Sequence, residues 1–436
     1  MRKIFGTDGA RGVANIELTP ELALKIGLAV GFKLGMDSPI LIGEDTRVSS
    51  PMLRCAVASG ISSTGTSVSL AYTIPTPAVS LLTRKKNFSA GIVVSASHNP
   101  IEYNGIKVFA KNGFKLEDSE EEEIESVLED SLAFPRGIKL GKIEESEHLK
   151  EFYIETLEKW FPLNLSGLKI AVDTAFGAAY YTTPETLRRL RADLVCFGNS
   201  ADGSRINVNC GSTHPGIISE LVKNHNASLG ISHDGDGDRV IFADENGEIV
   251  DGDETMLIIS RYLKNKGLLK NNTVVGTVMT NMGVENAFNE SGINFIRTKV
   301  GDRYVVSEML KTGAVLGGEQ SGHIIFLEKS STGDGLITAL LLLSVLIEEN
   351  KPLSMIRKGI VHFPQILVNA RVKDKSVIED SSFKKLVEEE NELLKGKGRI
   401  FIRPSGTEPL IRIMIEGEKK EIIEKIALKI KEYLEV

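Results

Sequence analysis

The chain is built from short apolar runs, typical of buried strands, that alternate with longer segments of helical periodicity. One predicted helix has Thr19 as its N-cap and Pro20 at its first position. The predicted strands lie at residues 40–42, 68–71, 91–94, 167–173, 227–231, 273–277, 294–298 and 314–316. Because strands and helices alternate, the pattern predicts βαβ units and hence an α/β fold.

The pattern changes in roughly the last 80 residues. Apolar and polar positions alternate over residues 366–372 and 411–415, which is the period of strands with one solvated face. A final amphipathic helix carries Ile422, Ile423, Ile426 and Ile430. We therefore predict a C-terminal α+β domain with an antiparallel sheet.

A chain of 436 residues is too long for one core, since single cores stop growing near about 250–300 residues. A charged stretch at residues 144–151 suggests a first boundary, and the strand and helix patterns restart near residues 150 and 250. We predict four domains, over residues 1–150, 151–247, 248–358 and 359–436.

Composition excludes several classes of protein. Asp and Glu outnumber Lys and Arg by 59 to 52, which argues against a nucleic-acid or anionic-membrane binder. Cys55, Cys196 and Cys210 are odd in number and form no Cys-x-x-Cys pair, so we expect neither a disulfide framework nor a zinc site. The first residues resemble no export signal, and the apolar run at 336–347 is shorter than the roughly 20 residues of a membrane span. We expect a cytoplasmic protein in which this run is a buried helix.

Polar loops follow three of the predicted strands, at residues 95–100, 233–238 and 317–323. In open α/β sheets, ligands bind outside the carboxyl ends of the strands. The loops therefore predict that several domains face one central cleft.

The second of these loops contains three aspartates, Asp234, Asp236 and Asp238, with a glycine between each pair. Glycines let the backbone fold tightly, so the carboxylates converge on one hard cation, and Mg²⁺ is the natural choice. An acidic surface turn is the simpler alternative. An EF-hand is the other, but Arg239 stands where its loop needs glycine, and the flanks are strand-like rather than helical.

The loop at residues 95–100 places the Ser97 hydroxyl beside the His98 imidazole, which suits a nucleophile or a phosphoryl carrier. Lys107 adds a cation nearby that could assist proton transfer. By itself such a serine-rich segment is usually an ordinary turn, and no Gly-x-Ser-x-Gly elbow supports a hydrolase triad.

Two further loops carry groups that suit a phosphosugar. Arg403, Ser405, Gly406 and Thr407 combine a guanidinium, two hydroxyls and a close backbone N–H, with Arg412 as a second fork for a phosphate. Glu319 and Ser321 suit sugar hydroxyls. In either case a plain turn is the alternative.

Together, the serine loop, the aspartate loop, the sugar loop and the phosphate loop resemble, in this order, the α-D-phosphohexomutase superfamily. Residues 5–12, 276–281, 299–304 and 318–323 resemble its phosphoglucosamine mutase branch, with Gln320 where phosphomannomutase/phosphoglucomutase relatives commonly have Met. Ala10 and His233 depart from the usual family residues. The resemblance implies three similar α/β domains with mixed sheets and a C-terminal α+β domain around a central cleft.

The resemblance also implies an isomerase reaction. Phospho-Ser97 would donate its phosphoryl group to glucosamine 6-phosphate, giving a 1,6-bisphosphate that returns the other group to leave glucosamine 1-phosphate for UDP-N-acetylglucosamine synthesis. One Mg²⁺ per chain would be held by Ser97 and the three aspartates.

Further roles follow from the same resemblance. Arg11, His98, Lys107 and Arg239 would serve proton transfer and charge stabilisation. The substrate-binding residues would be Lys299, Glu319, Ser321, Arg403, Ser405, Gly406, Thr407 and Arg412. The partner is a small phosphosugar, with no nucleic acid and no membrane; a homodimer is compatible with the resemblance, but the sequence leaves the oligomeric state open.

Three alternatives stay open at this point. The first is a phosphoglucomutase or phosphomannomutase of the same superfamily. The second is a phosphatase, in which water hydrolyses the phosphoserine. The third is a noncatalytic Ca²⁺-binding protein that uses the aspartate loop.

Overall fold

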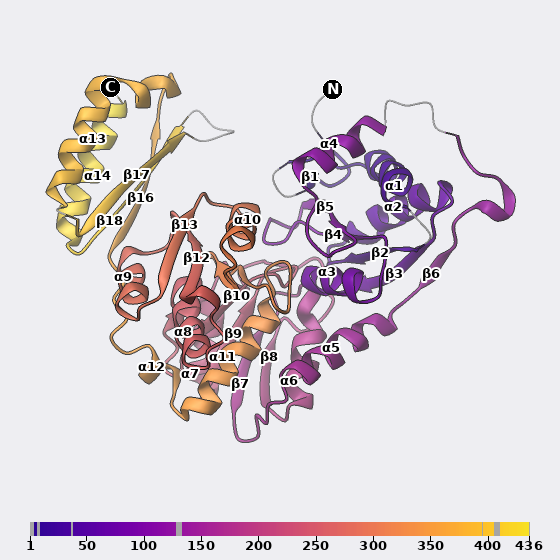
Figure 1. The fold of residues 1–436 in the computed structure, drawn as a ribbon, viewed down its shortest axis with the longest axis horizontal. Coiled ribbons are helices and arrows are strands. Elements are labelled where there is room, and N and C mark those ends of the chain that lie inside the picture. Colours follow the sequence, from indigo (N-terminus) through magenta and orange to yellow (C-terminus); the bar gives the residue numbers. More distant parts are fainter. Residues whose placement is uncertain are drawn as a thin grey trace. The chain divides into compact units, whose positions relative to one another are not determined.

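The structure is a computed structural model that describes residues 4–6, 9–35, 38–127, 133–394, 396–404 and 410–435. Two compact units make up the chain (Figure 1). The larger comprises residues 1–278 and 296–358, and the smaller comprises residues 279–295 and 359–436.

The first sheet of the larger unit has six strands in the order β1-β5-β4-β2-β3-β6. Its strands β2, β3, β4 and β6 pair in parallel, whereas β5 pairs antiparallel with both β4 and β1. The strands are β1 (Ala10–Val13), β2 (Ile40–Glu44), β3 (Val68–Thr73), β4 (Ala90–Val94), β5 (Tyr103–Ala110) and β6 (Ile143–Glu145). All residues of β2 and β4 are buried, as their continuous apolar runs predict.

The helices of this part are α1 (Pro20–Leu34), α2 (Ser50–Ser63), α3 (Thr76–Lys85) and α4 (Asp118–Val127). Helix α1 begins as predicted, because the Thr19 side chain accepts a hydrogen bond from the Leu22 amide and proline occupies the first turn. The apolar faces of α1 and α2 pack with β2 and β4 into one core.

The second sheet has the order β11-β10-β9-β7-β8, with β7, β8 and β9 parallel and β10 and β11 antiparallel. Its strands are β7 (Lys169–Asp173), β8 (Asp193–Phe197), β9 (Leu229–His233), β10 (Val240–Ala243) and β11 (Ile249–Val250). The accompanying helices are α5 (His148–Trp160), α6 (Thr182–Arg189) and α7 (Gly216–His225).

The third sheet has the order β13-β12-β14-β15, in which β14 pairs in parallel with β12 and antiparallel with β15. Its strands are β12 (Thr273–Thr277), β13 (Asn294–Thr298), β14 (Leu316–Gly318) and β15 (Ile324–Phe326). The helices are α8 (Gly252–Asn265), α9 (Met282–Glu290), α10 (Asp302–Thr312), α11 (Gly335–Glu349) and α12 (Leu353–Ile356). The apolar run at 336–347 forms α11, which is buried over most of its length as predicted. Among the described residues, no helix has the length and apolarity that crossing a bilayer requires.

The smaller unit contains an antiparallel sheet in the order β16-β18-β17. Its strands are β16 (Gln365–Arg371), β17 (Gly398–Pro404) and β18 (Leu410–Gly417), and its C-terminal helices are α13 (Ser381–Leu393) and α14 (Lys420–Glu435). Ile423, Ile426 and Ile430 of α14 are buried against the sheet, whereas Ile422 is 37% exposed and lies off the apolar face. Three α/β parts with mixed sheets and a C-terminal α+β part are the predicted fold class.

Candidate active site

Ser97 lies in the loop that follows β4, and its side chain is turned into the protein. The residue is only 2% exposed, and its Oγ donates a hydrogen bond of 2.6 Å to Asp234 Oδ2. The His98 Nδ1 lies 3.3 Å from the same Oγ. The loop therefore brings a hydroxyl, a carboxylate and an imidazole within hydrogen-bonding distance.

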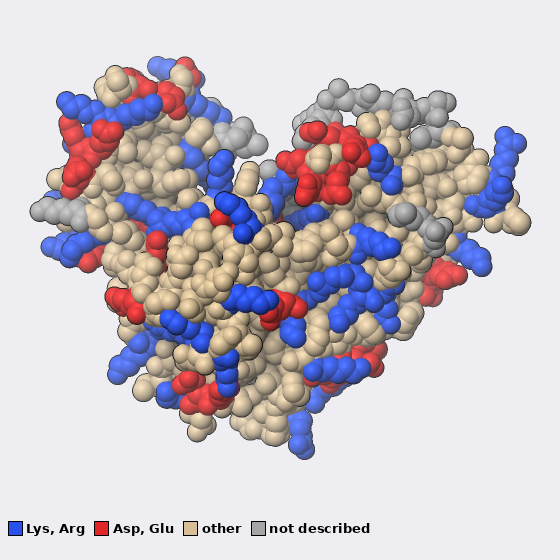
Figure 2. Space-filling model, in the orientation of Figure 1, with Lys and Arg blue, Asp and Glu red and all other residues tan. Residues whose placement is uncertain are grey.

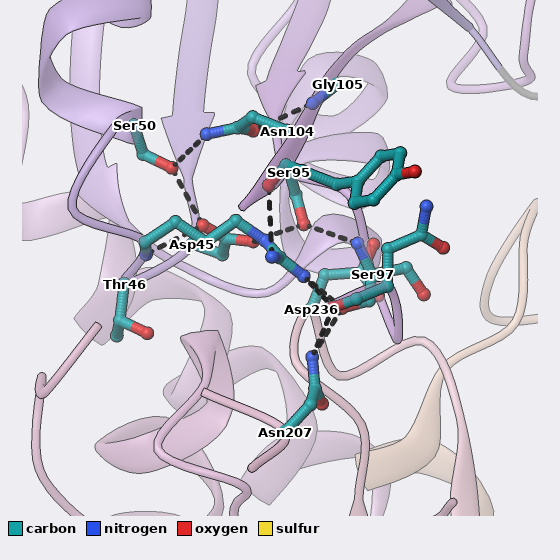
Figure 3. A network of polar contacts seen from close by, with 12 residues as sticks. Asp45, Thr46, Ser50, Ser95, Ser97, Asn104, Gly105, Asn207 and Asp236 are labelled. Atoms are coloured by element: carbon teal, nitrogen blue, oxygen red, sulfur yellow. Dashed lines mark hydrogen bonds and ion pairs between the residues drawn. The ribbon is translucent and has the colours of Figure 1, made fainter. Parts of the chain in front are cut away.

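The backbone of Ser97 has a φ of +52°, in the left-handed region that costs a non-glycine residue roughly 1–2 kcal/mol. Surrounding groups hold it there. The Ser97 amide donates to Ser95 Oγ at 2.9 Å, and the Asn207 side chain donates to the Ser97 carbonyl at 2.8 Å (Figure 3). Left-handed residues held in this way cluster at functional sites.

The three aspartates lie in the loop between β9 and β10. Their carboxylates each offer an oxygen, and these oxygens lie within 4.8 Å of one another in a fully buried group. Asp236 Oδ1 and Asp238 Oδ1 have no hydrogen-bond partner among the described residues. Because β9 and β10 are paired strands, the loop lacks the flanking helices of an EF-hand.

The charges of this group favour a bound cation. Burial first, and then the charges of Asp238 and Asp236, raise the pKa of Asp234 well above its usual value. Three buried carboxylates with unpartnered oxygens can all be ionised only if positive charge offsets them. The oxygen-only donor set fits a hard divalent ion such as Mg²⁺.

Lys107 and Arg239 supply part of that positive charge. Lys107 is 1% exposed, and its Nζ lies 2.9 Å from Asp236 Oδ2 and 3.8 Å from Asp238 Oδ2. The Arg239 amide donates to Asp234 Oδ1 at 3.2 Å, whereas its Nε has no hydrogen-bond partner among the described residues. The same Nε lies 3.9 Å from Asp238 Oδ1, so Arg239 adds a second positive charge beside the aspartates.

His98 is uncharged at neutral pH. Burial first, and then the charge of Arg239, lowers its pKa to about 4. Arg11 Nη1 donates a long hydrogen bond of 3.4 Å to Asn99 Oδ1, and its charge also acts on His98. A neutral imidazole can accept or release a proton next to the Ser97 hydroxyl.

His323 also belongs to this cluster, although the sequence pattern identifies it only as the last residue of the polar loop 317–323. Its Nδ1 lies 3.5 Å from Asp238 Oδ2, and its Nε2 accepts a hydrogen bond of 3.1 Å from the Gly333 amide. Burial is the largest influence and opposes protonation, but the Asp238 and Asp302 carboxylates together raise the pKa of His323. Its position in a polar loop that follows a predicted strand was the sequence signal that could have identified it as a site residue.

Of the predicted sugar-binding residues, Glu319 and Ser321 lie together in the loop between β14 and β15. Glu319 Oε1 accepts from the Gly301 amide at 2.9 Å, and Ser321 Oγ lies 3.5 Å from Glu319 Oε2. Burial lowers the pKa of Arg239, but the charges of Asp238, Asp234 and Glu319 raise it overall, so Glu319 and the aspartates act on the same guanidinium. Lys299 is exposed, with its Nζ 5.8 Å from the centre of the Tyr304 ring.

The predicted phosphate loop belongs to the smaller unit. Arg403 on β17 and Arg412 on β18 are direct partners in the antiparallel register, and both are exposed. Ser405, Gly406 and Thr407 lie outside the described residues.

A cavity of about 900 Å³ lies in the larger unit, next to the cluster formed by the three aspartates and His323. Lys115, Asp302 and Arg303 line it, and Asp302 Oδ2 lies 3.9 Å from His323 Nε2. The acidic side chains of α4 gather near its rim (Figure 2). None of the predicted sugar-binding residues that the structure describes is among its lining residues.

Sequence reasoning missed a second layer of residues behind Ser97. Asp45 and Arg47 follow β2, and Asn207 lies in the loop after β8. Asp45 accepts from Ser95 Oγ at 2.6 Å (Figure 3). The polar residues 44–47 at the end of a buried strand were the available signal, because three other strand-end loops were recognised in that way.

Four family models match the chain along its length. They are the domains of phosphoglucomutase/phosphomannomutase: the α/β/α domain I over residues 2–133, domain II over 151–247, domain III over 251–362 and the C-terminal domain over 367–432. Together these ranges cover most of the sequence.

Curated relatives and solved structures agree with these matches. The phosphoglucosamine mutase of Caldanaerobacter subterraneus subsp. tengcongensis is 48% identical, with 100% of this chain and 99% of the relative covered. That of Carboxydothermus hydrogenoformans is 49% identical, with 98% of each covered. A crystal structure of a phosphoglucomutase/phosphomannomutase family protein from Burkholderia thailandensis has the same fold, with a TM-score of 0.82 at 23% identity over 98% of this chain and 96% of that one. The chain therefore belongs to the phosphoglucomutase/phosphomannomutase family of α-D-phosphohexomutases, in the branch of the phosphoglucosamine mutases.

Proposed function

We propose that the chain is an isomerase that interconverts glucosamine 6-phosphate and glucosamine 1-phosphate, with Ser97 as the phosphoryl carrier. The observation that carries the proposal is the Ser97 hydroxyl, buried and 2.6 Å from the first of three converging carboxylates. Full-length identity of 46–49% to proteins named phosphoglucosamine mutase supports the choice of sugar.

Each half-reaction exchanges one P–O bond for another. In the first, the bond between phosphorus and Ser97 Oγ breaks as a bond forms to the free hydroxyl oxygen of the sugar phosphate. The hydroxyl proton passes to a base, and Ser97 Oγ ends as a hydroxyl. In the second, Ser97 Oγ takes the other phosphoryl group from the 1,6-bisphosphate, which leaves the isomeric monophosphate.

Several residues of the chain would serve these proton and charge movements. The neutral His98 imidazole lies 3.3 Å from Ser97 Oγ and can take or return a proton there. Lys107 and Arg239 provide fixed positive charge, and Arg11 on β1 donates a 3.4 Å hydrogen bond to Asn99, which follows Ser97 in the serine loop. Phosphoryl transfer depends mainly on such positioning and electrostatics.

We further propose that Asp234, Asp236 and Asp238, with the phosphate on Ser97, hold one Mg²⁺ per chain. When bound, the ion offsets negative charge on the transferring group. The unpartnered oxygens of Asp236 and Asp238 support this assignment.

The remaining contacts are proposed from the loops. Glu319 and Ser321, with Lys299, would hold sugar hydroxyls. The phosphate that is not transferred would be bound by Arg403, Ser405, Gly406, Thr407 and Arg412.

The four domains would span residues 1–150, 151–247, 248–358 and 359–436. A cytoplasmic location and a homodimer belong to the same proposal, and cell fractionation and sedimentation would test them.

The sugar is tested by comparing kcat/KM for the 6-phosphates of glucosamine, glucose and mannose on the pure protein charged with a 1,6-bisphosphate. We expect glucosamine 6-phosphate to be preferred by at least about 10-fold, which corresponds to about 1.4 kcal/mol of transition-state binding. A preference for glucose or mannose would overturn the assignment of the sugar. Steady release of inorganic phosphate in place of isomerisation would overturn the mutase in favour of a phosphatase.

A further inference from the structure

Arg47 is completely buried behind the loop that carries Ser97. The residue is 1% exposed, and its guanidinium is ion-paired with Asp45 through a 2.9 Å contact from Nε to Oδ2. Both side chains of this pair are fully shielded from solvent. Breaking a buried pair leaves an uncompensated charge, so the pair fixes the position of the guanidinium.

The other four N–H groups of Arg47 all point at the backbone of the serine loop. Its Nη1 donates to the carbonyls of Pro100 and Tyr103 at 2.5 and 3.0 Å, and its Nη2 donates to those of Ser97 and Asn99 at 2.9 and 2.8 Å. A guanidinium has five N–H donors in a rigid planar fork, and here all five are used. No side chain with fewer donors can make this set of bonds.

The carbonyl of Ser97 is fixed from a second direction as well. Asn207 Nδ2 donates to it at 2.8 Å, and a Cβ atom at Gly235 would lie only 2.6 Å from it. The Ser97 amide is held in turn by Ser95 Oγ, which donates to Asp45 (Figure 3). Both peptide groups that flank Ser97 are thus tied, directly or through Asp45, to one buried ion pair.

We infer that Arg47 is a positioning residue for phosphoryl transfer: its saturated guanidinium holds Ser97 in the left-handed conformation that aims Oγ at the aspartates, although Arg47 itself cannot touch the substrate. The inference rests on the proposed role of Ser97 as the phosphoryl carrier. It goes beyond that role because it makes the rate of phosphoryl transfer depend on Arg47, which follows β2, whereas Ser97 follows β4. Asn207 contributes to the same positioning from the loop after β8.

The test compares Arg47→Lys with Arg54→Lys. Lysine keeps the charge of Arg47 but has three donors, so it cannot bind Asp45 and four carbonyls together. Arg54 on α2 is a matched control, because its Nε pairs with Glu44 at the same strand end at 3.0 Å and its guanidinium lies over the Tyr72 ring of β3. Each protein is charged with glucose 1,6-bisphosphate, and intact mass gives the fraction that carries a phosphoryl group. The rate at which that fraction transfers to saturating glucosamine 6-phosphate is then measured by rapid quench.

We expect Arg47→Lys to lower the transfer rate of the chargeable fraction by at least about 10-fold, with KM within about 2-fold of wild type and Arg54→Lys unchanged. A purely structural role would lower the chargeable fraction or the melting temperature and leave the rate of that fraction at the wild-type value. That result would overturn the inference.

If Arg47→Lys does not fold, Asn207→Gly decides, with Asn209→Gly as its control. Asn207 and Asn209 both have positive φ, at +59° and +52°, so glycine suits either position, but Asn209 is exposed. We expect Asn207→Gly to slow transfer by at least about 3-fold and Asn209→Gly to have no effect. Equal transfer rates for these two variants would overturn the positioning role and leave the proposed function intact. If the wild type never carried phosphate on Ser97, both the positioning role and the proposed function would be overturned.

Discussion

At the scale of single residues, the site gathers like charges that cannot be stable together without compensation. Asp234, Asp236 and Asp238 are all buried, and two of their oxygens have no hydrogen-bond partner among the described residues, although Arg239 Nε lies 3.9 Å from one of them, Asp238 Oδ1. Lys107 offsets part of the charge on Asp236 and Asp238. The unpartnered oxygens then define where a cation adds most stability.

Magnesium should therefore stabilise the folded protein, independently of catalysis. At about 100 times its Kd, the ion adds about 2.7 kcal/mol, which raises the melting temperature by about 2–6 °C. We expect Asp238→Asn to lose most of this rise, because it removes one of three charged ligands. Thermal unfolding with Mg²⁺ or with EDTA measures the effect.

The exposed Asp193, on β8, provides the control for this measurement. Asp193→Asn should respond to Mg²⁺ as wild type does. An equal magnesium shift in Asp238→Asn and wild type would place the ion elsewhere.

At the scale of elements, the serine loop and the aspartate loop touch each other through their backbones. A Cβ atom at Gly235 would lie 2.6 Å from the Ser97 carbonyl and 2.6 Å from Asn207 Nδ2. Real Cβ atoms do not approach backbone this closely, so any side chain at this position must push the two loops apart.

Gly235→Ala should accordingly slow catalysis more than it lowers stability. A displacement of about 1 Å at reacting groups can reduce a rate by about 10²-fold, and we expect a loss of kcat of at least about 10-fold. Gly216→Ala is the matched control, since a Cβ atom at Gly216, the first residue of α7, meets nothing within 4 Å. Steady-state kinetics that leave both variants at the wild-type kcat would rule out close packing of the two loops.

Helix α11 begins at a buried carboxyl whose ionisation depends on pH. Asp334 caps the helix by accepting from the Ile337 amide at 2.9 Å, and it accepts from the Tyr153 hydroxyl at 2.9 Å. Burial raises its pKa to about 6 from an ordinary value of 3.8. Between these values the folded state holds more protons than the unfolded state, so this group destabilises the fold as pH rises.

Replacing Asp334 by asparagine keeps a capping oxygen and removes the titration. The stability of wild type relative to Asp334→Asn should fall as pH rises from about 4 to about 6 and stay constant above, by up to about 3 kcal/mol in total. Urea unfolding of both proteins across this range measures the difference. Curves that stay parallel at every pH would show that Asp334 does not titrate in this way.

Much of the element order follows from the sequence. The predicted strands 273–277 and 294–298 coincide with β12 and β13. Strand β12 is buried at every position, and its short apolar run between polar residues is the signal of a buried strand, whereas β13 is only half-buried. Strand β17 was not predicted, because its apolar run covers only residues 400–402, although its partner β18 was recognised. Short alternating segments carry little signal until a neighbouring strand fixes their register.

The site was predictable only where chemistry concentrates in one motif. Three aspartates in register indicate a metal site from local sequence alone. The roles of Arg47 and Asn207 depend on bonds to the Ser97 backbone across 50 and 110 positions of the chain. Such long-range hydrogen bonds to carbonyls leave no local pattern, because any residue presents the same carbonyl.

At the scale of the whole molecule, the chain passes between the two compact units three times, and for the last time at Lys358 and Gly359. Arg357, just before this point, is anchored by Glu254 at 2.6 Å and Asp244 at 3.3 Å, whereas Gly359 has a φ of +90° and a Cβ there would meet nothing within 4 Å. The segment thus has a fixed end next to an unhindered glycine. We predict a hinge here, because a bisphosphate must reverse its orientation between the two half-reactions.

Small-angle X-ray scattering should register this hinge. Because Arg403 and Arg412 of the smaller unit are proposed to bind the phosphate that is not transferred, we expect glucosamine 6-phosphate to reduce the radius of gyration. Free glucosamine, which lacks the phosphate, should leave the profile unchanged. Superimposable profiles with and without the sugar phosphate would argue against the motion.

Ser97 is proposed to carry the phosphoryl group and to pass it to the sugar. Intact mass spectrometry with peptide mapping tests this directly in a single turnover. Charged wild type should show an excess of about 80 Da on Ser97, and adding glucosamine 6-phosphate should remove it as bisphosphate forms in equal amount. Ser97→Ala should never gain the mass and should lose at least about 10³-fold in kcat/KM. A phosphoryl group on another residue, or full activity in Ser97→Ala, would contradict the account.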